Sequence, residues 1–247
     1  MVLPFHIVIP ARMASSRLPG KPLALLDDRT VIEHVWRRAS EAGAQSVVVA
    51  TDDERIAQCV RGFGGDLEMT RANHQSGTDR VAEVARARGW DDALIVNVQG
   101  DEPFIPVSAI QQVVGLLAEK RAGDIATLSV PFESTDQWRD PNCVKVVADC
   151  HGHAMLFSRA AIPYPRQSAA PVAQRHIGIY GYRSHALQEM VSTVPCALEI
   201  AESLEQLRAM WLGMKIVVAE AQEVPPPGID TEDDLAAARA TLRAAKA

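Results

Sequence analysis

Three cationic side chains lie near the start of the chain, and their types and spacing suit the binding of phosphate groups. Arg12, Arg17 and Lys21 lie within ten residues of one another, and no Asp or Glu precedes Asp27. An arginine binds phosphate oxygens through paired N–H groups, and a lysine adds a compact positive charge. Three fixed charges match a triphosphate or pyrophosphate better than one phosphate, so we expect a polyphosphate site here. A solvated basic loop is the alternative that charge alone leaves open.

The segment around these charges differs from both familiar glycine-rich phosphate loops. No G-x-G-x-x-G follows the first apolar run, and Pro22 follows Gly20 and Lys21, so the P-loop pattern G-x-x-x-x-G-K-[ST] is absent. The small residues 14–16 allow the backbone to approach a ligand, and their amides can donate hydrogen bonds to phosphate oxygens. We therefore expect a short loop of small residues to bind the phosphates, with three cations around it.

Two acidic stretches could hold a metal ion beside such phosphates. Asp101 lies in the sequence Gln-Gly-Asp-Glu-Pro after an apolar run, and Asp230 precedes Thr231, the expected cap of the last helix. An acidic turn that faces a triphosphate is repelled unless a cation lies between them, and Mg²⁺ prefers oxygen ligands. An ordinary Gly-Asp turn is the alternative for Asp101. The spacing does not show that the two acids act together.

Strands and helices alternate in the first half of the chain, which predicts an α/β fold. Short apolar runs, typical of buried parallel strands, occupy residues 5–10, 47–51, 67–70, 93–98 and 125–130. Helices are predicted between them at residues 30–43, 53–62, 78–89 and 106–120, with N-caps at Thr30 and at Thr78 or Asp79. This order requires a mostly parallel open sheet with helices on both faces. Ligands of such sheets bind beyond the carboxyl ends of the strands, where the loop of residues 10–22 lies.

The second half is less regular and contains a β-rich insertion. We predict strands at residues 144–148, 154–158, 177–182 and 215–219, and helices at residues 184–193, 203–212 and after Thr231. The Pro-rich stretch 162–172 is expected to be extended. We find no internal repeat and no flexible linker, so residues 1–247 are expected to form one domain with the β-rich region inserted on the same sheet.

Composition excludes several other classes of protein. The 247 residues are 47% hydrophobic and 23% charged, with a formal net charge of −6, which excludes a disordered chain and argues against a general nucleic-acid or anionic-membrane binder. No apolar run approaches the ~18 residues of a membrane helix, and we read no secretory signal at the start. The four cysteines form no CxxC pair and no zinc-type cluster, which fits a reducing cytoplasm.

The loop with the three cations resembles the signature of an enzyme family. The pattern P-A-R-x-x-S-x-R-x-P-x-K is similar to that of cytidylyltransferases, in the form typical of the 3-deoxy-manno-octulosonate cytidylyltransferase (CMP-KDO synthetase) family. Here it comprises Pro10, Ala11, Arg12, Ser15, Arg17, Pro19 and Lys21. Residues 76–80 (Ser-Gly-Thr-Asp-Arg), 99–103 (Gln-Gly-Asp-Glu-Pro) and 228–231 (Gly-Ile-Asp-Thr) also resemble the family. The likeness covers essentially the whole chain.

The resemblance implies a Rossmann-like nucleotidyltransferase fold that binds CTP mainly with residues 1–130. The CTP contacts that it implies are Pro10, Ala11, Arg12, Ser15, Arg17, Lys21, Ser76, Arg80 and Gln99. Arg12 and Lys21 would act in catalysis together with Asp101 and Asp230, the two residues that would hold the catalytic Mg²⁺. A second Mg²⁺ would be carried by the β- and γ-phosphates.

Three stretches of the second half resemble the sugar-binding part of the same family. They are Phe-Ser-Arg and Ile-Pro-Tyr within residues 157–164, His-Ile-Gly-Ile-Tyr-Gly-Tyr at 176–182 and Glu-Ser-Leu-Glu-Gln-Leu-Arg at 202–208. The contacts to a sugar acid that they imply are Arg159, His176, Tyr180, Glu205 and Gln206. Ala161 departs from the family pattern, in which Pro is common before Ile162, and residues 167–173 carry no motif.

The resemblance also implies a reaction and its partners. CMP would be transferred from CTP to the anomeric 2-hydroxyl of KDO, with release of pyrophosphate, as a cytoplasmic step of lipopolysaccharide biosynthesis. Residues 131–247 would bind the sugar and form a homodimer, and neither nucleic-acid binding nor membrane insertion is expected. Two alternatives stay open: transfer to another sugar acid, such as 8-amino-KDO or a sialic acid, and a nucleotide-binding regulator without catalysis.

Overall fold

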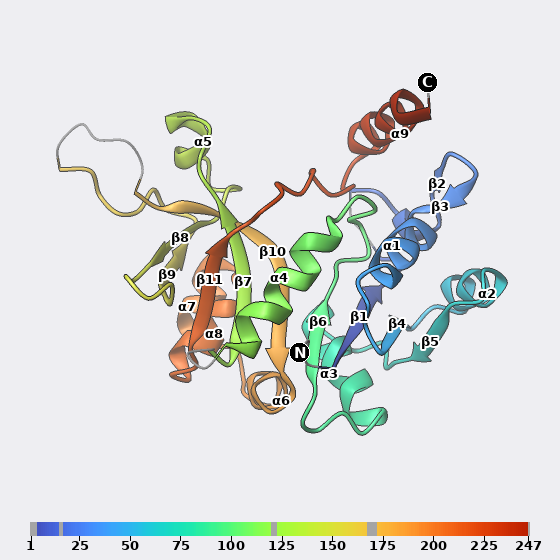
Figure 1. Cartoon of the computed structure of the whole chain (residues 1–247), viewed down its shortest axis with the longest axis horizontal. Helices are drawn as coiled ribbons and strands as arrows, with labels where there is room; N and C mark the ends of the chain where they lie inside the picture. The colour runs from blue at the N-terminus through green and yellow to red at the C-terminus, as the bar shows by residue number, and fades with distance from the viewer. Residues whose placement is uncertain (1–3, 15–16, 120–122, 167–171, 247) are drawn as a thin grey trace.

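A nine-stranded β-sheet runs through the middle of the computed structural model, which describes residues 4–14, 17–119, 123–166 and 172–246 (Figure 1). The strands of this sheet are β1 (Phe5–Ala11), β4 (Ser46–Thr51), β5 (Asp66–Met69), β6 (Leu94–Asn97), β7 (Ile125–Val130), β8 (Lys145–Ala148), β9 (Ala154–Ser158), β10 (Gln174–Arg183) and β11 (Ile216–Glu220). A separate small ribbon is formed by β2 (Leu25–Leu26) and β3 (Arg29–Thr30).

Nine α-helices and one short 3-10 turn are found in this described part of the chain. They are η1 (Lys21–Leu23), α1 (Val31–Ser40), α2 (Glu54–Gly62), α3 (Gly77–Ala87), α4 (Val107–Ala118), α5 (Thr135–Arg139), α6 (Ser184–Ser192), α7 (Ala197–Glu202), α8 (Gln206–Trp211) and α9 (Glu232–Lys246). None of these helices is both long and apolar enough to cross a lipid bilayer.

The strand order confirms the expected mostly parallel sheet and adds an antiparallel strand to its centre. The main path is β11-β7-β10-β6-β1-β4-β5. β1 pairs in parallel with β4 and with β6, β4 pairs in parallel with β5, and β11 pairs in parallel with β7. β10 runs antiparallel between β6 and β7, and β8 and β9 extend from it as an antiparallel ribbon. The β-rich region therefore joins the same sheet.

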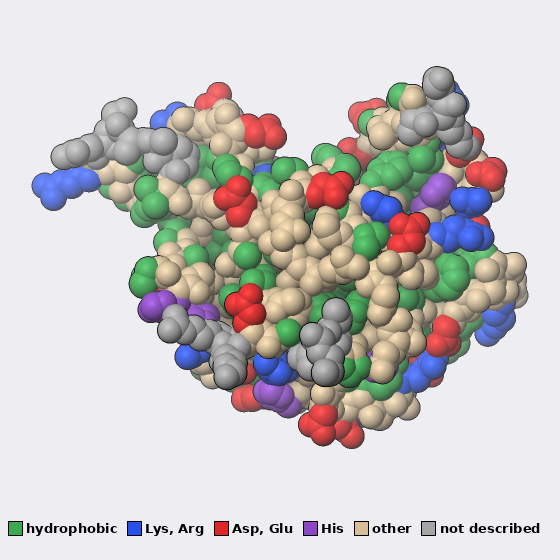
Figure 2. Space-filling model, viewed as in Figure 1, with side chains coloured by type: hydrophobic (Ala, Val, Ile, Leu, Met, Phe, Trp, Pro, Cys, Tyr) green, Lys and Arg blue, Asp and Glu red, His purple; other side chains and the backbone are tan. Residues whose placement is uncertain are grey.

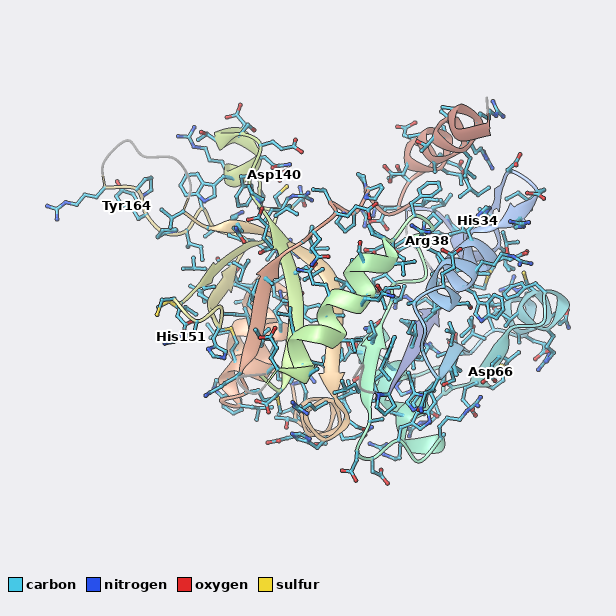
Figure 3. All side chains as sticks on the ribbon, in the orientation of Figure 1. His34, Arg38, Asp66, Asp140, His151 and Tyr164 are labelled. Carbon is cyan, nitrogen blue, oxygen red and sulfur yellow. The ribbon has the colours of Figure 1, made fainter. Side chains whose placement is uncertain are left out.

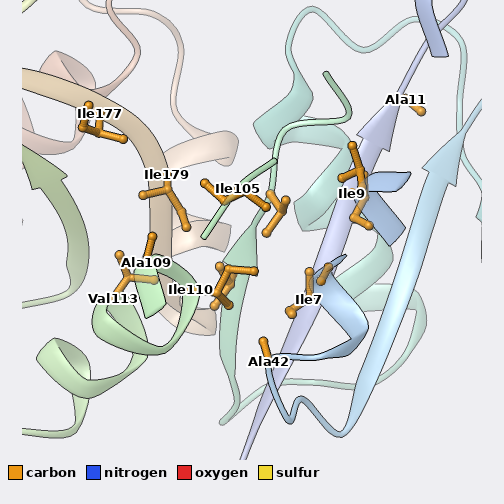
Figure 4. Packing of buried hydrophobic residues seen from close by; sticks show 14 of the residues in the cluster. Ile7, Ile9, Ala11, Ala42, Ile105, Ala109, Ile110, Val113, Ile177 and Ile179 are labelled. Atoms are coloured by element: carbon orange, nitrogen blue, oxygen red, sulfur yellow. The ribbon is translucent and has the colours of Figure 1, made fainter. Parts of the chain in front are cut away.

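Helices cover both faces of the sheet, as the alternation of its side chains requires. Along β1, Ile7 and Ile9 belong to a buried cluster that includes residues of α1, α2, α4 and α9, whereas Val8 belongs to a second cluster that includes residues of α3, α6 and α8. Figure 4 shows the first of these layers, where Ala109 and Ile110 of α4 lie over the strands. The two aliphatic layers fix the strands, and the strands in turn fix the loops that follow β1 and β6.

The ends of β1 and β6 lie at the upper edge of the sheet in Figure 1. After β11 the chain runs along this edge to α9, which brings the segment with Asp230 to the loops of the first half. In the space-filling view the outline is hollowed at this edge, between the parts that carry α5 and α9 (Figure 2). Tyr164 projects outward on the side of α5, away from α9 (Figure 3).

The cap of α3 is Ser76, and the expectation of a cap at Thr78 or Asp79 was wrong. The Ser76 hydroxyl accepts a hydrogen bond from the Asp79 amide, and the Asp79 carboxylate accepts one from the Ser76 amide, each of 3.1 Å. This reciprocal capping box satisfies two helix N–H groups at once. Thr78 lies inside the first turn and is buried. The expected caps Thr30 and Thr231 are confirmed.

Several elements differ from expectation, most of them in the second half. The helix expected at residues 203–212 starts later, as α8, and the separate helix α7 precedes it, because Ser203 adopts a left-handed conformation with φ of 51°. β10 begins at Gln174 rather than at Ile177, and its register shifts between Ile177 and Tyr180. The short helix α5 and the ribbon of β2 and β3 were not predicted.

Candidate active site

A cavity of about 640 Å³ lies where the loops after β1 and β6 meet the first turn of α3 and the segment before α9. All the expected nucleotide contacts that the structure describes line it, together with both expected metal ligands: Pro10, Ala11, Arg12, Arg17, Lys21, Ser76, Arg80, Gln99, Asp101 and Asp230. Ser15, the remaining expected contact, lies outside the described residues. The chain thus brings the cationic loop and two distant acids into one cavity.

Two glycines allow these loops to approach one another. A Cβ atom on Gly100 would lie 2.7 Å from the carbonyl oxygen of Pro10, and one on Gly77 would lie 3.2 Å from the Pro10 ring. A side chain does not fit at Gly100, because the obstructing atom belongs to the backbone. The end of β1 is therefore held tightly between the loop that carries Asp101 and the first turn of α3.

Lys21 joins the two expected metal ligands. Its ammonium donates a 2.5 Å hydrogen bond to Asp101 and a 3.0 Å hydrogen bond to Asp230. Arg17 pairs with the same Asp230 carboxylate at 2.9 Å. Burial alone would lower the pKa of Lys21, but the two carboxylates outweigh this effect and raise the pKa above its usual value. Lys21 is therefore charged, and the two acids share one cation.

Two carboxylates of this kind fit a magnesium site that the substrate completes. Among the residues that the structure describes, no three His, Cys, Asp or Glu side chains gather as a metal-binding group. Mg²⁺ typically takes one or two carboxylates from a protein and its other ligands from substrate phosphates and water. Asp101 and Asp230 line the same cavity as the loop cations, and their oxygens would become available to Mg²⁺ if a bound phosphate drew Lys21 away from them.

Glu102 is a second acid in the turn that carries Asp101. Burial, and then the negative charge of Asp101, raise the pKa of Glu102 to about 8. Its carboxyl group is therefore mostly protonated near neutral pH. The negative charge that faces the loop cations at this turn therefore comes from Asp101 and Asp230, and Glu102 contributes little to it.

Arg80 presents a buried guanidinium to the same cavity. It is 4% exposed, donates a hydrogen bond to the Thr70 hydroxyl and pairs with Asp52 at 3.3 Å. Thr70 follows β5 and Asp52 follows β4, so two neighbouring strand ends hold the guanidinium in place. Arg80 can therefore contribute a fixed polar wall to a nucleotide site, in contrast to the more exposed Arg17 of the loop.

His74 also lines the nucleotide cavity and was missed by the sequence reasoning. Its imidazole contacts the Glu83 carboxylate of α3, which also accepts a hydrogen bond from the Arg71 amide. Burial alone would raise the pKa of Glu83, but the bonds from His74 and Arg71 outweigh it and lower the pKa. The signal that could have identified His74 is its place two residues before the helix cap Ser76.

A second cavity, of about 110 Å³, gathers three of the five expected sugar contacts. Tyr180 of β10 lines it together with Glu205, Gln206 and Tyr182. The Tyr180 hydroxyl is buried and has no hydrogen-bond partner within the described part of the chain. Because a buried hydroxyl without a partner is costly, a polar ligand atom would be stabilised at this point.

The other two expected sugar contacts do not line this cavity. The His176 ring lies 5.3 Å from that of Tyr180 and forms a 3.0 Å hydrogen bond with Thr127. Burial lowers the pKa of His176 to about 3, so its imidazole is neutral and can bind a sugar hydroxyl only by hydrogen bonds. The Arg159 guanidinium donates to the carbonyl oxygens of Glu202 and Pro141, and its contact with the sugar stays a prediction.

Known proteins resemble this chain in sequence and structure over nearly their whole length. A family model described as cytidylyltransferase matches residues 6–216. The 3-deoxy-manno-octulosonate cytidylyltransferase of Pseudomonas fluorescens is 50% identical over 250 residues, covering 97% of this chain and 98% of the relative. A solved structure of CMP:2-keto-3-deoxy-manno-octonic acid synthetase complexed with CTP is 42% identical, with a TM-score of 0.91 over 97% of this chain and 98% of that one.

A more distant structure shares the fold alone. The 4-diphosphocytidyl-2C-methyl-D-erythritol synthase of Anaerococcus prevotii is 12% identical, with a TM-score of 0.64 over 97% of this chain and 96% of that one. The family model spans most of the sequence, and the relative at 50% identity covers almost all of it. The chain therefore belongs to the cytidylyltransferases and, among them, to the 3-deoxy-manno-octulosonate cytidylyltransferase (CMP-KDO synthetase) family.

Proposed function

We propose that this protein transfers CMP from CTP to the anomeric 2-hydroxyl of KDO and releases pyrophosphate. The observation that carries the proposal is the single cavity in which Arg12, Arg17 and Lys21 lie with Asp101 and Asp230. The name of the curated relative supports KDO as the acceptor, and the solved relative in complex with CTP supports CTP as the donor. The product would serve lipopolysaccharide biosynthesis, and the free cysteines of the chain fit a reducing cytoplasm.

The chemistry requires positioning and charge neutralisation more than covalent help from the protein. The sugar hydroxyl attacks the α-phosphorus in line and gives up its proton to solvent, one P–O bond forms, and the bond to the bridging oxygen of pyrophosphate breaks. Arg12, Arg17 and Lys21 would neutralise the triphosphate and the charge that develops on pyrophosphate. Asp101 and Asp230 would hold Mg²⁺, which adds charge neutralisation and Lewis acidity when bound. The phosphates themselves would carry a second ion.

The remaining contacts would orient the two substrates. Ser76, Arg80 and Gln99 line the nucleotide cavity beside the end of β1, where they would contact the ribose and the base. In the smaller cavity Tyr180 and Glu205 would exchange hydrogen bonds with sugar hydroxyls, since one offers an O–H group and the other carboxylate oxygens. The two groups of contacts would thus adjoin at the first turn of α3, where Thr78 bonds Glu205.

Pyrophosphate release from CTP in the presence of Mg²⁺ and KDO tests the proposed reaction. We expect kcat/KM for KDO to exceed that for 8-amino-KDO or a sialic acid by at least about tenfold, because buried polar groups reject an acceptor that leaves them unpaired. A higher value with a sialic acid would overturn KDO as the substrate. Binding of CTP without release of pyrophosphate, whichever acid is added, would instead indicate a nucleotide-binding regulator.

We also propose that two copies of the chain form a homodimer through the second half. Large apolar side chains are exposed on neighbouring elements of this half: Met155 and Leu156 on β9, Leu198 and Ile200 on α7, and Trp211 on α8. α8 packs against both α7 and β9, so these elements are contiguous. Exposed apolar groups gathered in this way are typical of a surface that another protein covers.

A further inference from the structure

Thr78 lies between the nucleotide cavity and the sugar cavity. It occupies the second position of α3, between Ser76 and Arg80, which both line the nucleotide cavity. Its hydroxyl donates a 2.7 Å hydrogen bond to Oε2 of Glu205, a residue that lines the sugar cavity. Thr78 is only 4% exposed. One buried hydroxyl therefore connects the first turn of α3 with the start of α8.

Tyr182 lies beside this contact. It lines the sugar cavity together with Glu205. Burial, together with the charge of Glu205, holds the pKa of Tyr182 well above its usual value, so its hydroxyl stays protonated. The hydrogen bond that reaches the Glu205 carboxylate from α3 is therefore the one that Thr78 donates.

The Glu205 carboxylate keeps one oxygen for a ligand. Among the described residues, the side chain that donates a hydrogen bond to this carboxylate is Thr78, and the bond goes to Oε2. Tyr180, whose buried hydroxyl has no partner within the same described part, lines the cavity beside Glu205. A glutamate side chain has several rotamers, and restricting them before the ligand arrives strengthens binding. An anchor on Oε2 leaves Oε1 for the sugar.

We propose that Thr78 is a positioning residue for the acceptor: its hydroxyl fixes Glu205 so that Oε1 accepts a hydrogen bond from a hydroxyl group of the sugar acid. The proposal rests on the role of Glu205 in the proposed function. By this proposal Thr78, which lies in the half of the chain that would bind CTP, also takes part in binding the sugar. Ser76 and Arg80 flank Thr78 at the start of α3, so the same end of this helix carries groups that line the nucleotide cavity and the anchor of the sugar site.

Steady-state kinetics of matched variants test this role. Thr78→Val removes the hydroxyl and keeps the shape, whereas Thr78→Ser keeps the hydroxyl. We expect Thr78→Val to raise KM for KDO about tenfold, as the loss of a hydrogen bond to a charged group does, and to leave KM for CTP within about twofold. Thr78→Ser should keep KM for KDO within about threefold of the parent.

A double-mutant comparison separates positioning from a general structural effect. If Thr78 acts through Glu205, Thr78→Val combined with Glu205→Gln raises KM for KDO no further than Glu205→Gln alone. Multiplied effects, an unchanged KM for KDO in Thr78→Val, or an equal rise of both KM values would overturn the proposal.

Thr78→Ala is the second variant, for the case that Thr78→Val does not fold. It also removes the hydroxyl that Glu205 accepts from and introduces no larger side chain, so we expect a similar rise in KM for KDO that disappears when Glu205→Gln is added. A rise that persists in that combination would also overturn the role of Thr78. Failure of the proposed function would look different, because the unmodified protein would then release no pyrophosphate with KDO.

Discussion

Lys21 explains how Asp101 and Asp230 can lie together before any ligand binds. Two carboxylates in one cavity repel each other, and the Lys21 ammonium, hydrogen-bonded to both, offsets this repulsion. The ammonium and a metal ion then compete for the same oxygens. A triphosphate would remove this competition, because its own oxygens attract Lys21. Metal binding is therefore expected to accompany nucleotide binding.

This competition gives a prediction that does not depend on activity. We expect Lys21→Met to tighten Mn²⁺ binding to the nucleotide-free protein by at least about tenfold. A tenfold change corresponds to ~1.4 kcal/mol, which is less than the interaction energy of two charges ~4 Å apart near a protein surface. Electron paramagnetic resonance of free Mn²⁺ measures the affinity. Lys215→Met, which removes an equal charge from an exposed position after α8, serves as the control and should have no effect. Unchanged or weaker binding in Lys21→Met would contradict the competition.

Removal of either carboxylate should stop the reaction without unfolding the protein. We expect Asp101→Asn and Asp230→Asn each to lower kcat by at least about 100-fold, or ~2.7 kcal/mol in the barrier, because each removes an oxygen ligand with its charge. Asp233→Asn is the matched control, since Asp233 is exposed in the same acidic run on α9. Thermal unfolding checks the fold. Residual activity within about tenfold of the parent would refute the metal assignment.

The neutral His176 gives the stability of the protein a dependence on pH. Its pKa is about 3 in the folded chain and about 6.5 in an unfolded one. Between these values the unfolded chain binds a proton that the folded chain does not, so stability falls as the pH decreases. Between pH 7 and pH 5, the free energy of unfolding of the parent should fall by about 2 kcal/mol more than that of His176→Gln. Urea unfolding at the two pH values measures both decreases. Equal losses would show that folding does not lower the pKa of His176.

Residue types and spacing in the sequence predicted most of the residues of the nucleotide site. The contacts among these residues could not be predicted in the same way. Arg12, Arg17 and Lys21 are recognisable because phosphate binding requires cations at close spacing. The bridge from Lys21 to Asp101 and Asp230, by contrast, depends on three segments that meet only in the folded sheet. No local pattern encodes such a meeting, and the family resemblance supplied it as an expectation.

At the scale of elements, the sequence predicted a strand or a helix correctly where a single kind of interaction determines it. Apolar runs identified the central strands because burial on both faces requires them. The start of α3 was misplaced because Ser76, Thr78 and Asp79 are all suitable caps, and the reciprocal bonds of Ser76 and Asp79 decide among them. Ser203 separates α7 from α8 without the Gly or Asn that usually marks such a conformation. The antiparallel direction of β10 results from pairing with strands distant in sequence.

The close packing of the loops after β1 and β6 also belongs to this scale. We expect Gly100→Ala to destabilise the protein by about 2 kcal/mol and to weaken CTP binding, because the new Cβ would press on the Pro10 carbonyl and displace the turn of Asp101. Gly115→Ala on the exposed face of α4, where nothing lies within 4 Å of the added Cβ, should stabilise by up to about 1 kcal/mol. Urea unfolding and CTP titration measure the two effects. Equal stability changes in both variants would exclude the steric explanation.

At the scale of the whole molecule, the two ends of the sheet differ in how they are protected. β5 ends one side with Asp66 and Glu68, which pair with Arg88 of the following segment. On the other side the main path ends at β11, and the ribbon that branches from β10 ends at β9; among the described strands β9 pairs with β8, and it exposes Met155 and Leu156. A strand edge with exposed apolar side chains invites association with another chain. The homodimer is therefore expected to form at the end of β9.

Sedimentation or light scattering of single variants can decide this arrangement. We expect the unmodified protein to have twice the mass of the 26.8 kDa chain, and Met155→Lys and Ile200→Lys to shift it towards the monomer, because a buried lysine without a partner costs several kcal/mol. Leu25→Lys is the control, since Leu25 is 56% exposed on β2, at the opposite side of the sheet from β9 (Figure 1). Dimers that survive both substitutions would place the interface elsewhere, and a monomeric parent at micromolar concentration would exclude it. Circular dichroism must show an intact fold in each variant, because only then does a loss of mass report on the surface and not on the core beneath it.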